Sequence, residues 1–332
     1  MEALGAVFKD VFIGLLGSLI TAGVIKLINF VRNKKLNKKY NISGRYITHY
    51  EDIIDDKTQM VYAPAKLVQK GMNVTGSTNM GSTEWEIEGK ILDSGYIYGM
   101  YSAMGILDKG VGNFFLEMKD GRLEGCWSGY DNVNNIVVSG KYQFIKIDIR
   151  EMTEDDVCKV IKIADGELGE GYLGSLDITP DKTEGENYCR LVALSKSKII
   201  GFCLCEYVDM DRLNDKYHIK NVPNWIRRGD KICMIKTVVV DKEWQCLGVA
   251  ETLLDEVFMK MNGCGIKAMT SIGWVKEGHT NIGHLLEKKG MKSVGIIENY
   301  WKEDSINTKF ICPVCGEPPC KCSAEIFFGL LE

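Results

Sequence analysis

The feature that most constrains the fold is a strand pattern followed at once by a helix pattern, between Met234 and Asn262. Residues 237–240 read Thr-Val-Val-Val, a composition typical of a buried strand. After a short polar turn, apolar residues recur at 253, 254, 257, 258 and 261, which is helical spacing. The pattern predicts a strand that feeds directly into a helix.

The loop between this strand and this helix has small residues at Gly248 and Ala250. Small residues let a backbone approach a ligand, and the free N–H groups of a helix's first turn can bind a diphosphate. The loop reads Gln245, Cys246, Leu247, Gly248, Val249 and Ala250. It resembles the Gln/Arg-x-x-Gly-x-Gly/Ala pyrophosphate loop of the GCN5-related N-acetyltransferase (GNAT) superfamily. Gly-x-Ala also occurs at helix starts for plain packing, so the sequence on either side of the loop must decide between a diphosphate-binding loop and a packed helix start.

The flanks resemble the order of elements in the GNAT family from about residue 146 to 304. A short strand at 147–150 leads through Thr153 and Asp156, an N-cap arrangement, into a helix. A hairpin follows over 191–208 with its turn at 195–198, and then an inserted segment from 209 to 230. Beyond the central unit we expect a strand at 266–272, a helix at 281–289 and a strand at 293–297.

The resemblance implies a GNAT α/β domain over residues 147–309 that uses acetyl-CoA. The N–H groups of residues 245–250 should hold the coenzyme A diphosphate, and the main chain of Val238 and Val240 should pair with the pantetheine arm. The family transfers the acetyl group directly: a base deprotonates the amine, the amine attacks the thioester, and an acid protonates the thiolate. No covalent enzyme intermediate is implied.

The general base and the general acid are less well defined. For the base we expect Glu206, at the end of the third strand, with Asp241 second. The family often takes its acid from a tyrosine in the last helix, at the position that Leu286 occupies here. Substitutes could come from Tyr300, His279 or His284, although each of these could instead be structural.

Residues 165–186 contain seven acidic residues and one basic residue, Lys182. In the family this region borders the acceptor site, so the acidic border favours a cationic amine acceptor such as a polyamine, an aminoglycoside or a lysine side chain. A solvated loop is the alternative interpretation.

Residues 40–146 show a period of two and predict a small antiparallel β-barrel. The expected strands are 45–50, 66–69, 73–78, 84–92, 96–104, 113–118, 123–130 and 136–147. The region loosely resembles lipocalin-like barrels, including membrane-tethered barrels of bacterial antiviral signalling that sense cyclic nucleotides. Aromatic residues could stack on a base or simply fill the core; they are Tyr96, Tyr98, Tyr101, Trp127 and Tyr130.

The segment Val11–Val31 has the length and apolar character of a membrane-spanning helix, and five cationic residues follow it at 32–39. We therefore expect residues 1–39 to form a single-pass anchor with the N-terminus outside and the other domains in the cytosol. Gly14, Ser18 and Ala22 would line one face of that helix, a pattern that permits a homodimer.

Four of the 12 cysteines crowd into the segment 310–332, at Cys312, Cys315, Cys320 and Cys322. Cys-Pro-x-Cys-Gly is typical of a zinc knuckle, and four thiolates with no histidine favour a closed structural Zn²⁺ site. A reduced cysteine tail is the alternative. We expect the remainder, 324–331, to return as a last edge strand.

Taken together, the sequence predicts an α+β multidomain protein that acts as a membrane-anchored, cytosol-facing N-acetyltransferase on a small-molecule or protein amine. The net charge of −4 gives no overall signature of nucleic-acid binding, so no nucleic-acid polymer is expected. The alternative is a ligand-sensing signalling protein whose barrel binds a small molecule or nucleotide and whose GNAT domain has lost turnover.

Overall fold

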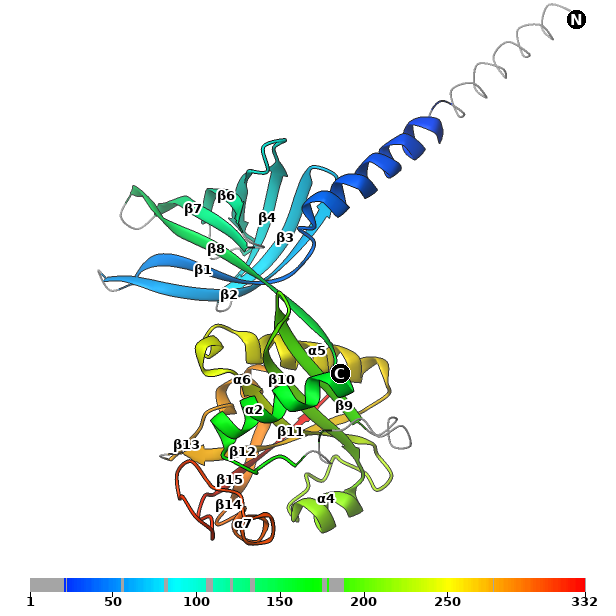
Figure 1. Cartoon of the computed structure of the whole chain (residues 1–332), viewed down its shortest axis with the longest axis vertical. Helices are drawn as coiled ribbons and strands as arrows, with labels where there is room; N and C mark the ends of the chain where they lie inside the picture. Colours follow the sequence, from blue (N-terminus) through cyan, green and yellow to red (C-terminus); the bar gives the residue numbers. More distant parts are fainter. Residues whose placement is uncertain are drawn as a thin grey trace, which may run out of the picture. The chain divides into compact units, whose positions relative to one another are not determined.

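The structure is a computed structural model of the chain. It describes residues 21, 23–54, 57–80, 83–105, 110–119, 122–131, 135–174, 178, 188–276 and 278–331. The chain divides into two compact units, Met1–Lys146 and Ile147–Glu332, and Figure 1 shows the strands of the first unit and the mixed helices and strands of the second.

The first unit is a closed antiparallel barrel of eight strands, as predicted, because each strand pairs with the next and β1 also pairs with β8. The strands are β1 (Gly44–Ile54), β2 (Lys57–Lys70), β3 (Asn73–Met80), β4 (Thr83–Ile91), β5 (Ile97–Ala103), β6 (Val111–Lys119), β7 (Arg122–Asp131) and β8 (Ile136–Glu151). Residues 136–145 of β8 pair with β7 in the first unit, whereas residues 148–151 already belong to the second unit and pair with its strand β9.

Aromatic rings fill the barrel interior where glycines leave room for them. A Cβ added at Gly112 or Gly129 would lie 2.2 or 2.6 Å from the hydroxyl oxygen of Tyr101. Trp127 also lies inside, and its indole N–H donates to the carbonyl of Glu51 at 2.9 Å. Of the aromatic residues considered for ligand stacking, Tyr98 and Tyr130 are instead exposed, at 45% and 47%.

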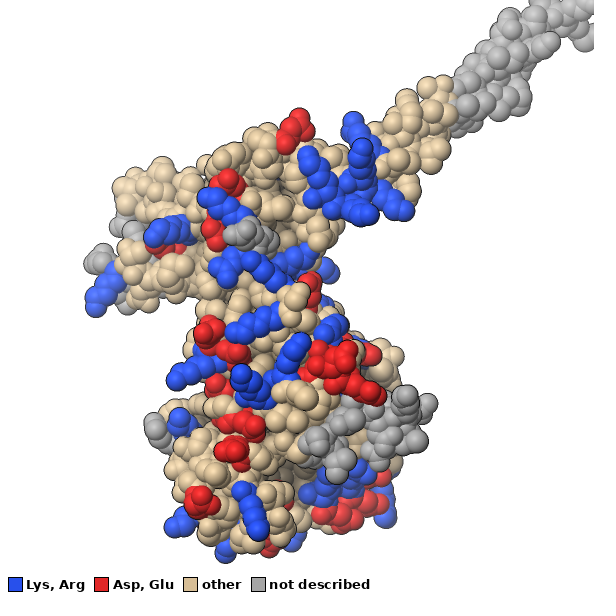
Figure 2. Space-filling view, viewed as in Figure 1, with Lys and Arg blue, Asp and Glu red and all other residues tan. Residues whose placement is uncertain are grey.

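The helix that precedes the barrel covers residues 23–40 and packs its end against the barrel core. The Gln69 side chain joins the two, since its amide N–H donates to the carbonyl of Leu36 at 3.2 Å and its carbonyl accepts from Ile42 N–H at 2.9 Å. Figure 2 shows basic side chains gathered at this end of the helix, at Arg32, Lys34, Lys35, Lys38 and Lys39.

The prediction of a single-pass membrane protein is wrong. Within the described residues, no helix combines the length and the apolar character that crossing a membrane requires. The described helix carries Lys26 among its apolar residues and five further cations over its last nine residues, which interrupts any apolar run. Residues 11–20 and 22 of the predicted segment lie outside the described residues, as do all three small residues behind the predicted homodimer.

The second unit is a mixed sheet whose strand order is β9-β10-β11-β12-β15-β14, with β11 and β12 parallel and the other neighbours antiparallel. The strands are β9 (Tyr188–Ser195), β10 (Lys198–Val208), β11 (Ile232–Val240), β12 (Ala268–Lys276), β13 (His279–Thr280), β14 (Lys292–Ile297) and β15 (Ala324–Leu330). The helices are α2 (Val157–Leu168), α4 (Met210–Tyr217), α5 (Val249–Gly263), α6 (Gly283–Lys288) and α7 (Lys302–Thr308), with short 3-10 turns at Glu154–Asp156 and Lys242–Trp244.

Helices cover both faces of this sheet. Val160 and Ala164 of α2 pack in one cluster with Phe202 of β10. Because side chains alternate along a strand, the neighbouring Cys203 points to the other face, where α5 packs against β9, β10 and β11. The predicted hairpin is confirmed, with Lys198 opposite Ser195.

The strand β15 is not the edge strand that the sequence predicted, because it pairs with β12 on one side and with β14 on the other. Its side chains at Ile326, Phe327 and Phe328 are at most 2% exposed. A strand buried on both faces is typical of a sheet interior. The more exposed β14 therefore forms the edge among the described strands.

The predicted N-cap arrangement before α2 is confirmed. The Asp156 carboxylate accepts the backbone N–H of Thr153 at 2.8 Å and two hydrogen bonds from the guanidinium of Arg150, at 2.5 and 2.9 Å. The hydrogen bonds from Arg150 outweigh the effect of burial and hold the pKa of Asp156 well below its usual range.

We expect Asp156→Asn to lower the free energy of unfolding at pH 7 by about 1–3 kcal/mol, because charge-assisted hydrogen bonds are lost from a buried group. The folded-state pKa is depressed, so the contribution is present above the unfolded pKa of about 3.9 and disappears as pH falls through the folded value. Urea unfolding between pH 3 and 7 measures it. The exposed neighbour Asp155→Asn is the control, and equal losses in both variants would contradict the assignment.

Candidate functional site

The site is centred on a divergence between the two parallel strands. β11 and β12 pair from Ile232 with Ala268 to Ile235 with Ser271, and the described pairing ends there. On its other side β11 continues to pair with β10 as far as Val240, with a register shift that leaves Lys236 as an extra residue. Residues 236–240 of β11 therefore extend past the part of the strand that pairs with β12, and we call this divergence of the two strands the β11–β12 opening.

The loop that follows β11 turns sharply into α5. Cys246 and Gly248 both have positive φ, at 59° and 83°, and Gly248 is the residue that precedes the helix. The Gln245 side chain bonds to the carbonyl of Val240 at 3.0 Å and to the Glu167 carboxylate at 2.6 Å, which joins the loop to the end of β11 and to α2. These hydrogen bonds hold the backbone of the loop in place directly after the end of β11.

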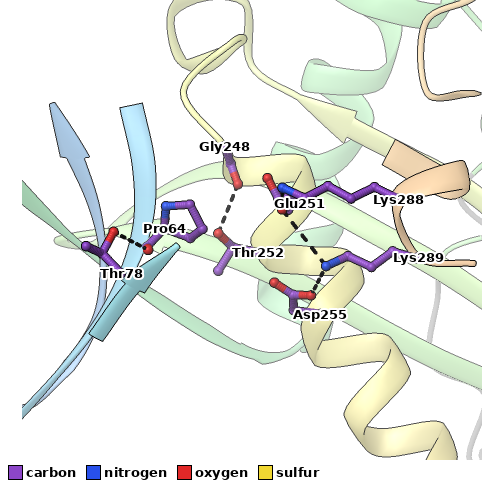
Figure 3. Close-up of polar contacts among 8 residues, drawn as sticks. All are labelled: Pro64, Thr78, Gly248, Glu251, Thr252, Asp255, Lys288 and Lys289. Atoms are coloured by element: carbon purple, nitrogen blue, oxygen red, sulfur yellow. Dashed lines mark hydrogen bonds and ion pairs between the residues drawn. The ribbon is translucent and has the colours of Figure 1, made fainter. Parts of the chain in front are cut away.

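The first turn of α5 presents backbone N–H groups, because no side chain of the described residues caps it. Figure 3 shows how the turn is held: the Thr252 hydroxyl donates to the carbonyl of Gly248 at 2.9 Å, and Lys288 of α6 contacts the buried Glu251 carboxylate at 2.6 Å. Lys289 lies beside Asp255 one turn later. A helix N-terminus with free N–H groups can bind an anion such as a diphosphate.

The comparison with protein families agrees with this geometry. The sequence profile of the acetyltransferase (GNAT) family matches residues 161–291. This part of the chain is a GNAT acetyltransferase domain. A search of curated proteins found no match to the sequence.

Solved structures resemble the GNAT domain and its flanks at low identity. Arabidopsis thaliana NAA60 in complex with acetyl-CoA is 12% identical, with a TM-score of 0.42, over 56% of this chain and 99% of its own. The Escherichia coli ribosomal-protein-S18-alanine N-acetyltransferase is 14% identical, with a TM-score of 0.39, and the match covers 56% of this chain and 94% of its own. The loading GNATL domain of CurA from Lyngbya majuscula is 12% identical, with a TM-score of 0.42, and the match covers 56% of this chain and 98% of that domain's chain.

Glu206 lies at the end of β10 on the face that α4 covers, and it is 2% exposed. Its carboxylate contacts Arg212 and Tyr217 and accepts a hydrogen bond from Lys216 at 2.7 Å. Burial opposes ionisation of Glu206, but the hydrogen bonds from Lys216 and Tyr217 and the charges of Lys216 and Arg212 outweigh it, so its pKa lies below the usual value. Its role as a base stays a prediction.

The other candidates for acid–base chemistry lie in two places. The Tyr300 hydroxyl donates to the carbonyl of Tyr217 at 2.9 Å, and burial raises its pKa above the usual value. Asp241 lies at the far end of β11, where it pairs with Lys198 at 3.4 Å and accepts the N–H of Glu243 at 3.1 Å. Glu206 and Tyr300 therefore both bond to Tyr217, one to its hydroxyl and one to its main-chain carbonyl, whereas Asp241 lies beside the loop that follows β11. His279 and His284 are exposed.

The sequence did not point to the α4 residues that surround Glu206. They belong to the inserted segment, for which the family pattern offers no counterpart. The sequence did contain a signal for this cluster. Arg212 and Lys216 are four residues apart, and so share one face of a helix that begins at Met210, shortly after Glu206, and is capped by Asp209. Leu286, in place of the family's tyrosine, is fully buried.

The four cysteines of the segment 312–322 lie in the connection between β14 and β15. Their side chains meet at one point, with all four sulfur atoms within 4.8 Å of one another. Backbone N–H groups of Cys315 and Lys321 point at sulfur atoms, at 3.4 and 3.3 Å, and Gly316 has a φ of 75°. Four sulfur atoms at one point, two of which accept these N–H groups, could hold a metal ion. We call residues 310–323 the cysteine knuckle.

We expect Gly248→Ala to cost about 1 kcal/mol of unfolding free energy, because a side chain is disfavoured at positive φ. Gly263→Ala, at the other end of α5 with no atom within 4 Å of an added Cβ, is the matched control and should be neutral or slightly stabilising. Urea unfolding of both variants measures the difference. Equal changes in unfolding free energy in the two variants would contradict a backbone at Gly248 that disfavours a side chain.

Proposed function

We propose that the chain is an N-acetyltransferase that moves an acetyl group from acetyl-CoA to an amine. The observation that carries the proposal is that β11 runs past its pairing with β12 and leads, through residues 241–248, into the first turn of α5, which no side chain of the described residues caps. In the proposed complex, the main chain of Val238 and Val240 pairs with the pantetheine arm. The N–H groups of the loop Gln245–Ala250 hold the diphosphate.

The proposed transfer is direct. The amine nitrogen attacks the thioester carbon, the C–S bond breaks, a base receives the amine proton and an acid gives a proton to the thiolate. Glu206 is the proposed base, with Asp241 second; its lowered pKa keeps it ionised at neutral pH, the form that a base needs. Tyr300 is the proposed acid, since a tyrosine hydroxyl is protonated at neutral pH; burial raises its pKa and makes it a weaker proton donor than an exposed tyrosine.

The acceptor is proposed to be a cationic amine, either a small molecule or a lysine or N-terminus of a protein. Support comes from the described part of the acidic border, where Asp165, Glu167 and Glu170 lie at the end of α2. Acidic groups beside a site attract cations and raise their local concentration.

We also propose that the cysteine knuckle binds one structural Zn²⁺ through Cys312, Cys315, Cys320 and Cys322. The support is the donor set itself: four sulfur atoms at one point, three of their residues buried, and N–H groups directed at sulfur. Tetrahedral S₄ sites of this kind are typical of structural zinc.

A specific observation favours the alternative function, a barrel that senses a ligand beside a GNAT domain without turnover. The indole N–H of Trp85, in the tilted ring pair with Tyr101, is buried and has no hydrogen-bond partner among the described residues. A bound acceptor atom would satisfy it. Acetyl-CoA binding without thiol release on any amine would favour this alternative.

We expect the full-length protein to release free thiol from acetyl-CoA in the presence of at least one member of a panel of polyamines, aminoglycosides and lysine peptides. Glu206→Gln should lower kcat at least about 100-fold, the size of general-base contributions, and leave acetyl-CoA affinity unchanged by calorimetry. Glu243→Gln, an exposed carboxylate near the loop, is the control. Equal turnover of Glu206→Gln and wild type at high pH would exclude Glu206 as the base.

We expect about one zinc per chain by elemental analysis after gentle purification, as a closed Cys₄ site requires. Cys320→Ser should lose the metal and lower Tm, because a structural site contributes folding free energy. Cys264→Ser, an exposed free cysteine, should keep both. Zinc content well below one per chain in the wild type would contradict the site.

A further inference from the structure

Tyr217, the last residue of α4, contacts both proposed acid–base residues although the sequence assigned it no role. Its hydroxyl donates to the Glu206 carboxylate, and its main-chain carbonyl accepts the hydroxyl of Tyr300 at 2.9 Å. The side chain is 5% exposed. One residue therefore fixes Glu206 through its side chain and Tyr300 through its backbone.

We infer that Tyr217 is a positioning residue that holds Glu206 and Tyr300 in register for acetyl transfer, an inference that rests on the proposed function. The backbone makes this arrangement available: the helix stops at His218, whose φ is 54°, and the last carbonyl groups of a helix have no intrahelical partner. The carbonyl of Tyr217 is one of these groups, and it accepts the hydrogen bond from the hydroxyl of Tyr300.

The groups that face Glu206 differ in how water affects them. Arg212 and Lys216 approach from α4 with side chains 47% and 42% exposed, so solvent and salt screen their charges. Tyr188 lies opposite on β9 and the apolar Met234 opposite on β11. Tyr217 is the buried donor, and removing its hydroxyl leaves a carboxylate oxygen that water cannot readily reach.

Tyr300 is fixed from a second side by the cysteine knuckle. Its backbone N–H donates to the carbonyl of Cys322 at 3.1 Å, and Cys320 N–H donates to the hydroxyl of Ser305 in α7 at 2.8 Å. The knuckle also reaches the end of α2, where Ile311 N–H donates to the carbonyl of Glu170 at 3.0 Å. Tyr217 thus connects Glu206 to Tyr300, which is itself bonded to the cysteine knuckle.

The test is Tyr217→Phe, which removes the hydroxyl and keeps the ring and the main-chain carbonyl. A lost hydrogen bond to the ionised form should raise the pKa of Glu206 by about one pH unit. The carboxyl carbon signal of Glu206, assigned by its absence in Glu206→Gln, reports that pKa by NMR. In steady-state kinetics kcat should fall about tenfold while KM for acetyl-CoA stays within about twofold.

Tyr207→Phe, on the other face of β10, is the matched control and should move neither the Glu206 titration nor kcat. Should Tyr217→Phe fold poorly, 3-fluorotyrosine at position 217 provides a stronger donor of nearly the same size and should lower the Glu206 pKa. A Glu206 titration that neither change moves overturns the positioning role, and so does an unchanged kcat. If the wild type releases no thiol with any amine, the proposed function fails, whereas the titration still decides whether Tyr217 positions Glu206.

Discussion

The second unit depends on the point at which β11 and β12 stop pairing. Two parallel strands that diverge leave backbone N–H and C=O groups without ladder partners, a costly arrangement unless another group satisfies them. The extra residue at Lys236 lets β11 bend while it keeps its bonds to β10. The loop at Gly248 and the start of α5 follow directly from the end of β11 beyond this point.

The sequence predicted those elements whose signal is local. Alternating strands of the barrel, the hairpin around Ser195 and the loop before α5 were each readable from periodicity and turn chemistry, and the N-cap at Asp156 from two residues. The cysteine spacing likewise predicted a cluster, because Cys-x-x-Cys-Gly is a turn with a defined shape. These features need no knowledge of distant contacts.

What the sequence could not predict depends on residues far apart in the chain. The surroundings of Glu206 are set by α4, and Tyr300 reaches Tyr217 across 83 residues. The membrane segment was inferred from the length and apolar character of residues 11–31, but the cations along residues 26–39 are spread through the described helix. The place of β15 within the sheet is a matter of strand order, and a seven-residue segment with one acidic residue among apolar ones fits an edge strand or a central strand equally well.

The position of β15 has a consequence for the order in which the chain can fold. β14 is synthesised before β15, yet its neighbour in the sheet is β15, so β14 has nothing to pair with until residues 324–330 leave the ribosome. The cysteine knuckle, which lies between them in the chain, is complete at Cys322, just before that moment. A preformed knuckle would bring β14 and β15 into antiparallel register as the last strand emerges, and would shorten the time for which β14 is an unpaired edge.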